Sequence, residues 1–287
     1  MQASEPNSTM KIGKINTLKV LREFEDDFVL DGDKSGEVFL PASQAPDGCN
    51  PGQKLDVFVY PELDGQLRAT CTLPKAQVGE CALLRAVNVI RAGAFMDWGI
   101  EKDLLVPVSQ QVRPLAVGKL YVVYLFLDPR GQIIGSSKLH HFLDENGQNM
   151  KPGETVDLLI VGETDLGFKA VINGTHLGLL FRNEVFQSLQ AGDKTRGCIK
   201  SIRHDGKIKL SLQRQNKKSR QDLTDRILEF LQCNQGSSTL TDYSPPGAIY
   251  KQYGVSKGNY KKALGALYKR RLISVSKDRI TLLKQQF

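Results

Sequence analysis

Aromatic and cationic side chains gather between residues 168 and 214 of the chain. Flat rings and positive charges occur together there in the set Phe168, Lys169, His176, Phe181, Arg182, Lys200, Arg203, Lys207, Lys209 and Arg214. Aromatic rings stack on nucleobases, and lysine and arginine neutralise the phosphates between them. This stretch therefore predicts a surface that binds a single-stranded nucleic acid, and we expect that strand to be RNA.

Other aromatic residues lie nearer the N-terminus. Phe95 and Trp98 precede Lys102 and form a possible secondary RNA-binding set, whereas Phe28 and Phe39 follow a run of acidic residues that would repel phosphate. For each of these rings the alternative stays open that it fills the interior of a domain or a seam between two domains. The first half of the chain, to about residue 145, is thus also compatible with a spacer or protein-contact function.

The positive charge is concentrated in the last third of the chain. Residues 198–287 contain 19 Lys and Arg against six Asp and Glu, a net charge of +13, although the whole chain carries only +8. Such an excess favours contact with a polyanion over a merely solvated surface.

Residue types that perform catalysis or bind metal are sparse and scattered. The four histidines, His140, His141, His176 and His204, lack a metal-ligand partner at helical spacing, and the five cysteines form no Cys-x-x-Cys pair. No phosphate-binding Gly-x-x-x-x-Gly-Lys motif occurs. We expect no enzyme activity, no cofactor and no metal.

Glycines and prolines recur at fixed intervals, which indicates internal repeats. Four pairs lie 66 residues apart: Gly13/Gly79, Pro41/Pro107, Gly52/Gly118 and Gly65/Gly131. A third copy follows at an interval of 74, where Gly153, Gly167 and Gly192 match Gly79, Gly93 and Gly118. The first 214 residues therefore predict three related domains.

Each copy contains several short apolar segments separated by turn residues. In the second copy we expect strands at 81–90, 93–99, 104–107, 120–126 and 133–137. Asp-Gly turns at 63–65, 128–131 and 204–206 predict the hairpin that joins the last two strands of each copy. Five strands in about 60 residues are typical of a small closed barrel.

Two segments resemble the S1 class of RNA-binding domains. Gly93–Gly99 resembles the second-strand motif of that class, and Lys207–Arg214 is similar to its closing strand. Where S1 domains carry a histidine after the third strand, copies one and two have Pro41 and Pro107 nearby. From residue 10 to residue 287 the chain resembles the bacterial conserved virulence factor B family, which implies RNA binding and post-transcriptional regulation without catalysis.

The last 68 residues predict a different kind of domain. Leu223, Ile227, Phe230 and Leu231 have helical spacing and indicate a helix over 222–232. Ser244 and Pro245 predict the start of a second helix that Gly254 ends, and a third helix follows Ser256, burying Tyr260, Leu264, Leu267 and Tyr268. A hairpin of 272–275 and 280–283 completes the winged-helix order.

The third of these helices has a basic side opposite its apolar side. Gly258, Lys262, Gly265, Ala266 and Lys269 share that side, so small residues between lysines allow close approach to a phosphate backbone. We predict that Lys257, Lys262, Lys269 and Arg270 contact RNA. Docking to a protein, and regulation through DNA, are the alternatives for this domain.

The expected molecule is a multidomain, mainly β protein: three tandem five-stranded OB (S1-like) barrels followed by an α+β winged-helix domain. We place the domains at residues 10–74, 75–145, 150–214 and 220–287. Because neither a long apolar run nor the basic-then-apolar order of a secretory signal occurs, we expect a cytoplasmic protein without a membrane partner. We also expect a monomer. Single-stranded RNA is the expected partner, with the ribosome or other proteins as further candidates.

Overall fold

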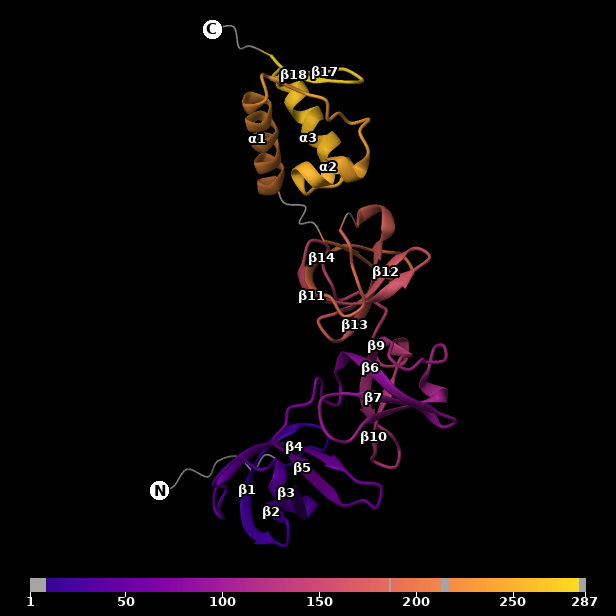
Figure 1. Cartoon of the computed structure of the whole chain (residues 1–287). Coiled ribbons are helices and arrows are strands. Elements are labelled where there is room, and N and C mark those ends of the chain that lie inside the picture. The colour runs from indigo at the N-terminus through magenta and orange to yellow at the C-terminus, as the bar shows by residue number, and fades with distance from the viewer. Residues whose placement is uncertain (1–8, 186, 213–216, 284–287) are drawn as a thin grey trace. The chain divides into compact units, whose positions relative to one another are not determined.

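The computed structural model describes residues 9–185, 187–212 and 217–283. The chain divides into two compact units, Met1–Leu143 and Asp144–Phe287, and Figure 1 shows the elements of both. Arg214 and the first eight residues lie outside the described residues. No helix in the described part of the chain is long and apolar enough to cross a membrane.

Barrel 1 is a closed sheet of five strands in the order β1-β2-β3-β5-β4. Alternate residues point inward, so Val20, Leu30, Val38 and Val57 share one buried core. The strands are β1 (Ile15–Phe24), β2 (Asp27–Asp31), β3 (Glu37–Pro41), β4 (Lys54–Pro61) and β5 (Leu67–Thr70), with short 3₁₀ helices η1 (Asp33–Ser35) and η2 (Ala42–Gln44).

Barrels 2 and 3 repeat this topology, so the three predicted barrels are confirmed. Barrel 2 contains β6 (Cys81–Ile90), β7 (Gly93–Asp97), β8 (Leu104–Pro107), η3 (Val108–Gln110), β9 (Leu120–Leu127), β10 (Ile133–Ser136) and η4 (Leu139–His141). Barrel 3 contains β11 (Thr155–Thr164), β12 (Gly167–Ile172), β13 (His176–Phe181), η5 (Arg182–Glu184), β14 (Lys194–Ile202) and β15 (Ile208–Ser211).

Irregularities of the strands recur at the repeat interval as well. The first strand of each barrel has a register shift at the matching place: Val20/Arg22, Ala86/Asn88 and Ile160/Gly162. Such bulges bend a strand so that it can pair on both sides of a small barrel. The repeat therefore includes the β-bulge in the first strand of each barrel.

The three Asp-Gly turns join the last two strands as predicted. In barrel 3, Gly206 has φ +82° and donates its N–H to the Arg203 carbonyl at 2.9 Å. A residue with a Cβ is strained in this left-handed conformation, which explains why glycine stands there. The turn fixes the register in which Ile208 lies opposite Ile202.

A shared core joins barrels 1 and 2 within the first unit. Phe58 and Tyr60 of β4 pack into the cluster that contains Trp98 and Met96 of barrel 2. Trp98 is only 2% exposed, and its ring meets Phe58 edge-on with centroids 5.4 Å apart. The indole Nε1–H donates to the Lys102 carbonyl.

The C-terminal domain has three helices and a three-stranded sheet, β16-β18-β17. Leu223, Ile227 and Leu231 pack against Tyr260 and Leu267 in one core. The elements are α1 (Lys217–Cys233), β16 (Ser237–Ser238), α2 (Pro246–Tyr253), α3 (Lys257–Lys269), β17 (Ile273–Val275) and β18 (Ile280–Leu282). Together they form the predicted winged helix.

Three details of the helical prediction were wrong. α1 begins five residues earlier than position 222, and α2 begins at Pro246 because Pro245, with its extended ψ of 141°, is the N-cap. Tyr268 is not in the core but 60% exposed. At 100° per residue it lies at the margin of the apolar side, where Leu264 and Leu267 already fill the interior.

Candidate nucleic-acid interface

The outer surface of barrel 3 carries a groove over three adjacent strands. β13 pairs with β12 on one side and with β15 on the other. Because side chains alternate, Ala170, Leu180 and Leu210 fill the core while their neighbours point outward. The groove measures about 200 Å³ and is lined by Glu145, Thr164, Leu166, Lys169, Leu177, Gly178, Leu179, Phe181, Arg203, Lys207, Ile208 and Lys209.

Phe181 and Lys209 form the centre of this groove. The Lys209 Nζ lies 5.1 Å from the centroid of the Phe181 ring, within the range of a cation–π contact. Both side chains are half-buried, so each keeps an accessible part. A ring and an ammonium group held together in this way can receive a base and its phosphate at the same place.

The structure brings five of the predicted cations and rings to the groove: Lys169, Phe181, Arg203, Lys207 and Lys209. Two of the cations have acidic partners. Lys169 lies 3.1 Å from Glu145, and Arg203 lies 3.2 Å from Asp205. These partially exposed pairs are weak and can exchange for a phosphate.

Four predicted residues of barrel 3 lie elsewhere. Phe168 points inward and packs against the core of the barrel. His176 starts β13, and its Nδ1 lies 2.9 Å from the Thr175 hydroxyl. Arg182 forms an ion pair with Glu163 at 2.8 Å, and Lys200 pairs with Glu184. None of the four lines the groove.

The sequence prediction missed the apolar wall of the groove. Leu177 and Leu179 alternate with Gly178 and share the outer side of β13 with Phe181. The two-residue period from 177 to 181 could have revealed them. Glu145 gave no such signal, because it precedes the barrel and reaches the groove through the bridges Asp144–His176 and Asn146–Lys207.

The matching surfaces of barrels 1 and 2 carry different chemistry. Phe181 pairs with Gly167 in the sheet, and the same register joins Pro41 to Asp27 and Pro107 to Gly93. The repeat therefore places a proline in two barrels where barrel 3 has the ring. By the pairing of the third and fifth strands, Lys209 corresponds to Arg68 in barrel 1 and to Ile134 in barrel 2.

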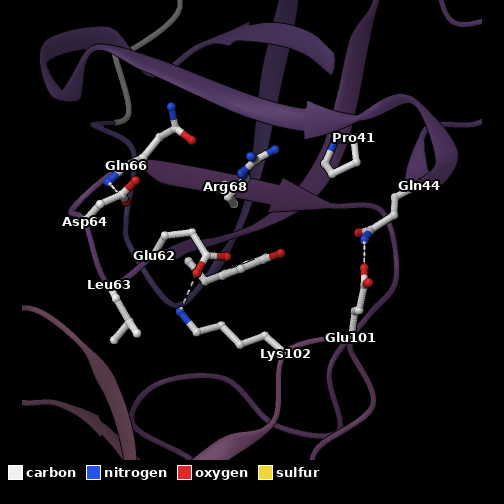
Figure 2. Close-up of a pocket in the computed structure, with 10 residues that line it drawn as sticks. Pro41, Gln44, Glu62, Leu63, Asp64, Gln66, Arg68, Glu101 and Lys102 are labelled. Carbon is white, nitrogen blue, oxygen red and sulfur yellow. Dashed lines mark hydrogen bonds and ion pairs between the residues drawn. The ribbon is translucent and has the colours of Figure 1, made fainter. Parts of the chain in front are cut away.

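In barrel 1 this surface is a larger hollow of about 530 Å³, which Figure 2 shows in close-up. Lys102 of barrel 2 reaches into it, donating to the Pro61 carbonyl at 2.7 Å and pairing with Glu62 at 3.2 Å. Gln44 donates to Glu101 at the other side (Figure 2). Burial and the nearby Glu62 raise the pKa of the Tyr60 hydroxyl.

The hollow is therefore poorly suited to phosphate. Arg68, the cation of barrel 1 that matches Lys209, forms an ion pair with Asp27 at 2.8 Å. Carboxylates of Glu62, Asp64 and Glu101 line the same space. Because these three carboxylates outnumber the two lining cations, Arg68 and Lys102, a polyanion would meet net repulsion there.

The possible secondary set in barrel 2 does not form a common surface. Trp98 is buried in the shared core, and Lys102 points into the hollow of barrel 1. Phe95 is half-buried and pairs with Leu105 across the strands. Of the two rings in this set, only Phe95 keeps accessible surface on barrel 2.

The basic side of α3 is exposed as predicted. Gly258, Lys262, Gly265, Ala266 and Lys269 all lie at the surface. Ser256 caps the helix by accepting from the Asn259 N–H at 3.2 Å. Within the described residues, Lys262, Lys269 and Arg270 form no ion pair, and Lys257 is half-buried.

Tyr268 adds a ring that the sequence prediction assigned to the core. It lies on the same side of α3 as Lys257 and Lys261, which precede it by three and two helical turns. Its exposed ring adds an aromatic side chain to a helix that also carries exposed lysines. The signal was the cluster Tyr268-Lys269-Arg270-Arg271 itself.

The described residues contain no group of three or more His, Cys, Asp or Glu side chains that could hold a metal ion. The cysteines form no disulfide bond, and burial raises the pKa of Cys81 to about 12, which keeps it protonated. Cys81 therefore contributes packing rather than a reactive thiolate, whereas Cys233 is exposed on α1.

Family comparisons match both ends of the chain. Residues 12–72 match the S1 domain, and residues 225–282 match the CvfB-like winged helix domain. Conserved virulence factor B of Staphylococcus epidermidis is 24% identical over 285 residues, which cover 96% of this chain and 95% of that protein. The uncharacterized protein YitL of Bacillus subtilis is 25% identical, covering 92% and 91%.

Among solved structures, a multidomain protein with nucleic acid binding domains from Streptococcus pneumoniae is 21% identical. It covers 95% of this chain and 98% of its own, with a TM-score of 0.40. The resemblance predicted from the sequence is confirmed by the two domain matches and the full-length relatives.

Proposed function

We propose, for a chain similar over nearly its whole length to the conserved virulence factor B proteins, that it binds single-stranded RNA and regulates gene expression at the RNA level. The outer groove of barrel 3 is the primary site in this proposal. The basic side of α3 is the second. A strand-binding groove without reactive groups among its described residues supports binding rather than catalysis.

One observation carries the proposal: the ring of Phe181 lies under Lys209 in a groove that also contains Lys169, Arg203 and Lys207. The apolar wall, in which Leu179 keeps accessible surface and Leu177 is buried behind it, excludes water from a stacked base. The lysines and Arg203 neutralise the adjoining phosphates. The affinity for RNA must then fall as the salt concentration rises, because the phosphates release their counterions when they bind the protein.

The contrast between the barrels supports assigning the function to barrel 3. Barrels 1 and 2 have the same topology as barrel 3, yet each has a proline at the position of the Phe181 ring. Each also has an acidic residue, Glu62 or Asp128, at the position of Arg203. We therefore assign barrels 1 and 2 a structural function.

The test is a titration of the full-length chain against a fluorescently labelled 12-residue single-stranded RNA at several salt concentrations. A Lys207→Glu, Lys209→Glu variant should lose affinity by at least about tenfold, because two repulsive charges enter the groove. Its matched control is Lys19→Glu, Lys34→Glu, which reverses two exposed charges on barrel 1. Equal losses in both variants would overturn the assignment to barrel 3.

The winged helix supports a second candidate, regulation through duplex DNA. Exposed small residues between Lys262 and Lys269 permit close approach of a duplex backbone. Competition between unlabelled duplex DNA and single-stranded RNA separates the two candidates. Stronger competition by the duplex at equal phosphate concentration would favour DNA.

A further inference from the structure

Glu145 is the only carboxylate among the described residues that line the groove of barrel 3. Backbone hydrogen bonds fix the segment that carries it. The Leu177 N–H donates to the Asp144 carbonyl at 2.8 Å, and the Gly147 N–H donates to the Gly206 carbonyl at 3.0 Å. The carboxylate therefore has a defined place beside β13.

A carboxylate in a phosphate-binding groove lowers its affinity for a polyanion, so its presence needs a reason. Its ion pair with Lys169 provides little stability, because the two side chains remain 41% and 33% exposed. The backbone bonds of residues 144 and 147 hold the segment without it. The Glu145 carboxylate therefore contributes little to the stability of the fold, which leaves contact with a ligand as its reason.

The neighbours of Glu145 indicate which part of the ligand it meets. Leu179 and Phe181, which keep accessible surface above the buried Leu177, form an apolar wall that suits the face of a base, whereas phosphates suit Lys207 and Arg203. A base stacked on that wall turns its hydrogen-bonding edge toward the polar side chains of the groove. Those side chains are Glu145 and Lys169, 3.1 Å apart.

Glu145 and Lys169 present two acceptor oxygens next to a cationic donor. The Watson–Crick edge of guanine presents the complement, two donors at N1 and N2 next to the O6 acceptor. Adenine and cytosine each offer one exocyclic donor beside a ring acceptor, and uracil offers one donor between two acceptors. Guanine alone among the four bases satisfies all three groups.

We propose that Glu145 makes the groove of barrel 3 selective for a guanine base in single-stranded RNA. The inference rests on the proposed function and specifies its ligand. Lys169 contacts O6 in this arrangement, and the Glu145 carboxylate accepts from N1–H and N2–H.

The test uses the full-length chain and three labelled eight-residue RNAs that differ at one position. All are oligouridine, with guanine, inosine or adenine in the centre. Inosine lacks only the exocyclic amino group of guanine. The wild-type chain should bind the guanine strand about tenfold more tightly than the inosine strand, the value of one hydrogen bond to a charged group.

Substitution of Glu145 then tests the residue itself. In Glu145→Gln the preference for guanine over inosine should fall below about twofold, because one acceptor is replaced by a donor. The matched control Glu154→Gln removes the same charge from an exposed position of barrel 3 outside the groove and should keep the preference.

The outcomes separate this inference from the proposed function. If none of the three RNAs binds, both are overturned. If all bind the wild-type chain with equal affinity, RNA binding stands and the selectivity is overturned. If Glu145→Gln weakens all three by one common factor, Glu145 only positions Lys169, which also overturns the inference.

Discussion

At the scale of single residues, neighbouring positions on one strand have separate tasks. Phe168 points into barrel 3 and Lys169 points out of it, although both were predicted to contact RNA. The sequence showed that a ring and a cation occur here. It could not show which one faces the solvent, because β12 ends in the apolar run Ala170–Ile172, which has no two-residue alternation.

Alanine at Phe181 and at Phe168 should therefore have opposite effects. Phe181→Ala should weaken RNA binding by about 1–3 kcal/mol because a base can no longer stack there, with little change in thermal stability. Phe168→Ala should lower the free energy of unfolding, on the order of 3 kcal/mol, because it leaves a cavity. Binding titrations and thermal melts of both variants test these expectations. Loss of stability in Phe181→Ala together with loss of RNA affinity in Phe168→Ala would contradict the placement of Phe181 in the binding surface.

Gly167 shows how closely two strands approach at the edge of the groove. Its φ is +150°, and a Cβ there would lie 2.0 Å from the Leu180 carbonyl oxygen. Gly93 has the equivalent contact, 2.3 Å from the Val106 carbonyl oxygen. Backbone cannot move aside as a flexible side chain can, so the repeated glycine is a packing requirement.

Gly167→Ala should consequently lower the melting temperature of the chain by several degrees. Gly174→Ala is a useful comparison, since its φ of +74° is strained by a Cβ but no atom lies within 4 Å of that Cβ. The difference between the two melts isolates the steric contact. An equal decrease would mean that backbone conformation alone accounts for the glycine.

At the scale of elements, most of the fold was predictable because turn chemistry and periodicity agree. The five strands of each barrel follow from apolar segments bounded by glycines, and Gly254, in the left-handed conformation with φ +66°, ends α2 as predicted. The start of α1 was not predictable from its apolar residues, which begin at Leu223. Polar residues before it extend the helix without adding to the apolar pattern.

The basic side of α3 should contribute to RNA binding independently of barrel 3. Lys262→Glu with Lys269→Glu should reduce the affinity for RNA by about tenfold. The slope of the logarithm of the binding constant against the logarithm of the salt concentration should become shallower by about one for each phosphate that the helix no longer binds. Lys251→Glu with Lys277→Glu changes the same charge elsewhere in the domain and serves as control. Unchanged affinity in the α3 variant would confine the site to barrel 3.

At the scale of the whole molecule, the residues that determine the topology differ from those proposed to bind a ligand. Residues 12–72 match the S1 domain, yet the outer surface of that barrel is engaged by Lys102 and by Gln132, whose side chain donates to the Glu62 carbonyl at 2.8 Å. The features that identify a fold lie in its core and turns. The features that bind a ligand lie outside, where the three copies differ.

Barrels 1 and 2 should unfold together, because Phe58 and Tyr60 lie in the core of the next barrel. Trp98 is the single tryptophan of the chain, so its fluorescence reports on this shared core. Val57→Ala, in the separate core of barrel 1, should lower the denaturation midpoint seen by Trp98. An unchanged midpoint, with exposed Val112→Ala as reference, would mean that the barrels unfold independently.

The Lys102–Glu62 contact has a consequence for long transcripts. A tandem array of OB barrels usually suggests a footprint that lengthens with each module, roughly 4–16 nucleotides per barrel. In barrel 1 the corresponding surface already holds Lys102 of the neighbouring module, so under the proposed function the footprint would correspond to barrel 3 and α3 alone. If the proposed function holds, we expect many copies of the protein to bind along one transcript, with an occupancy that scales with transcript length rather than with the number of barrels.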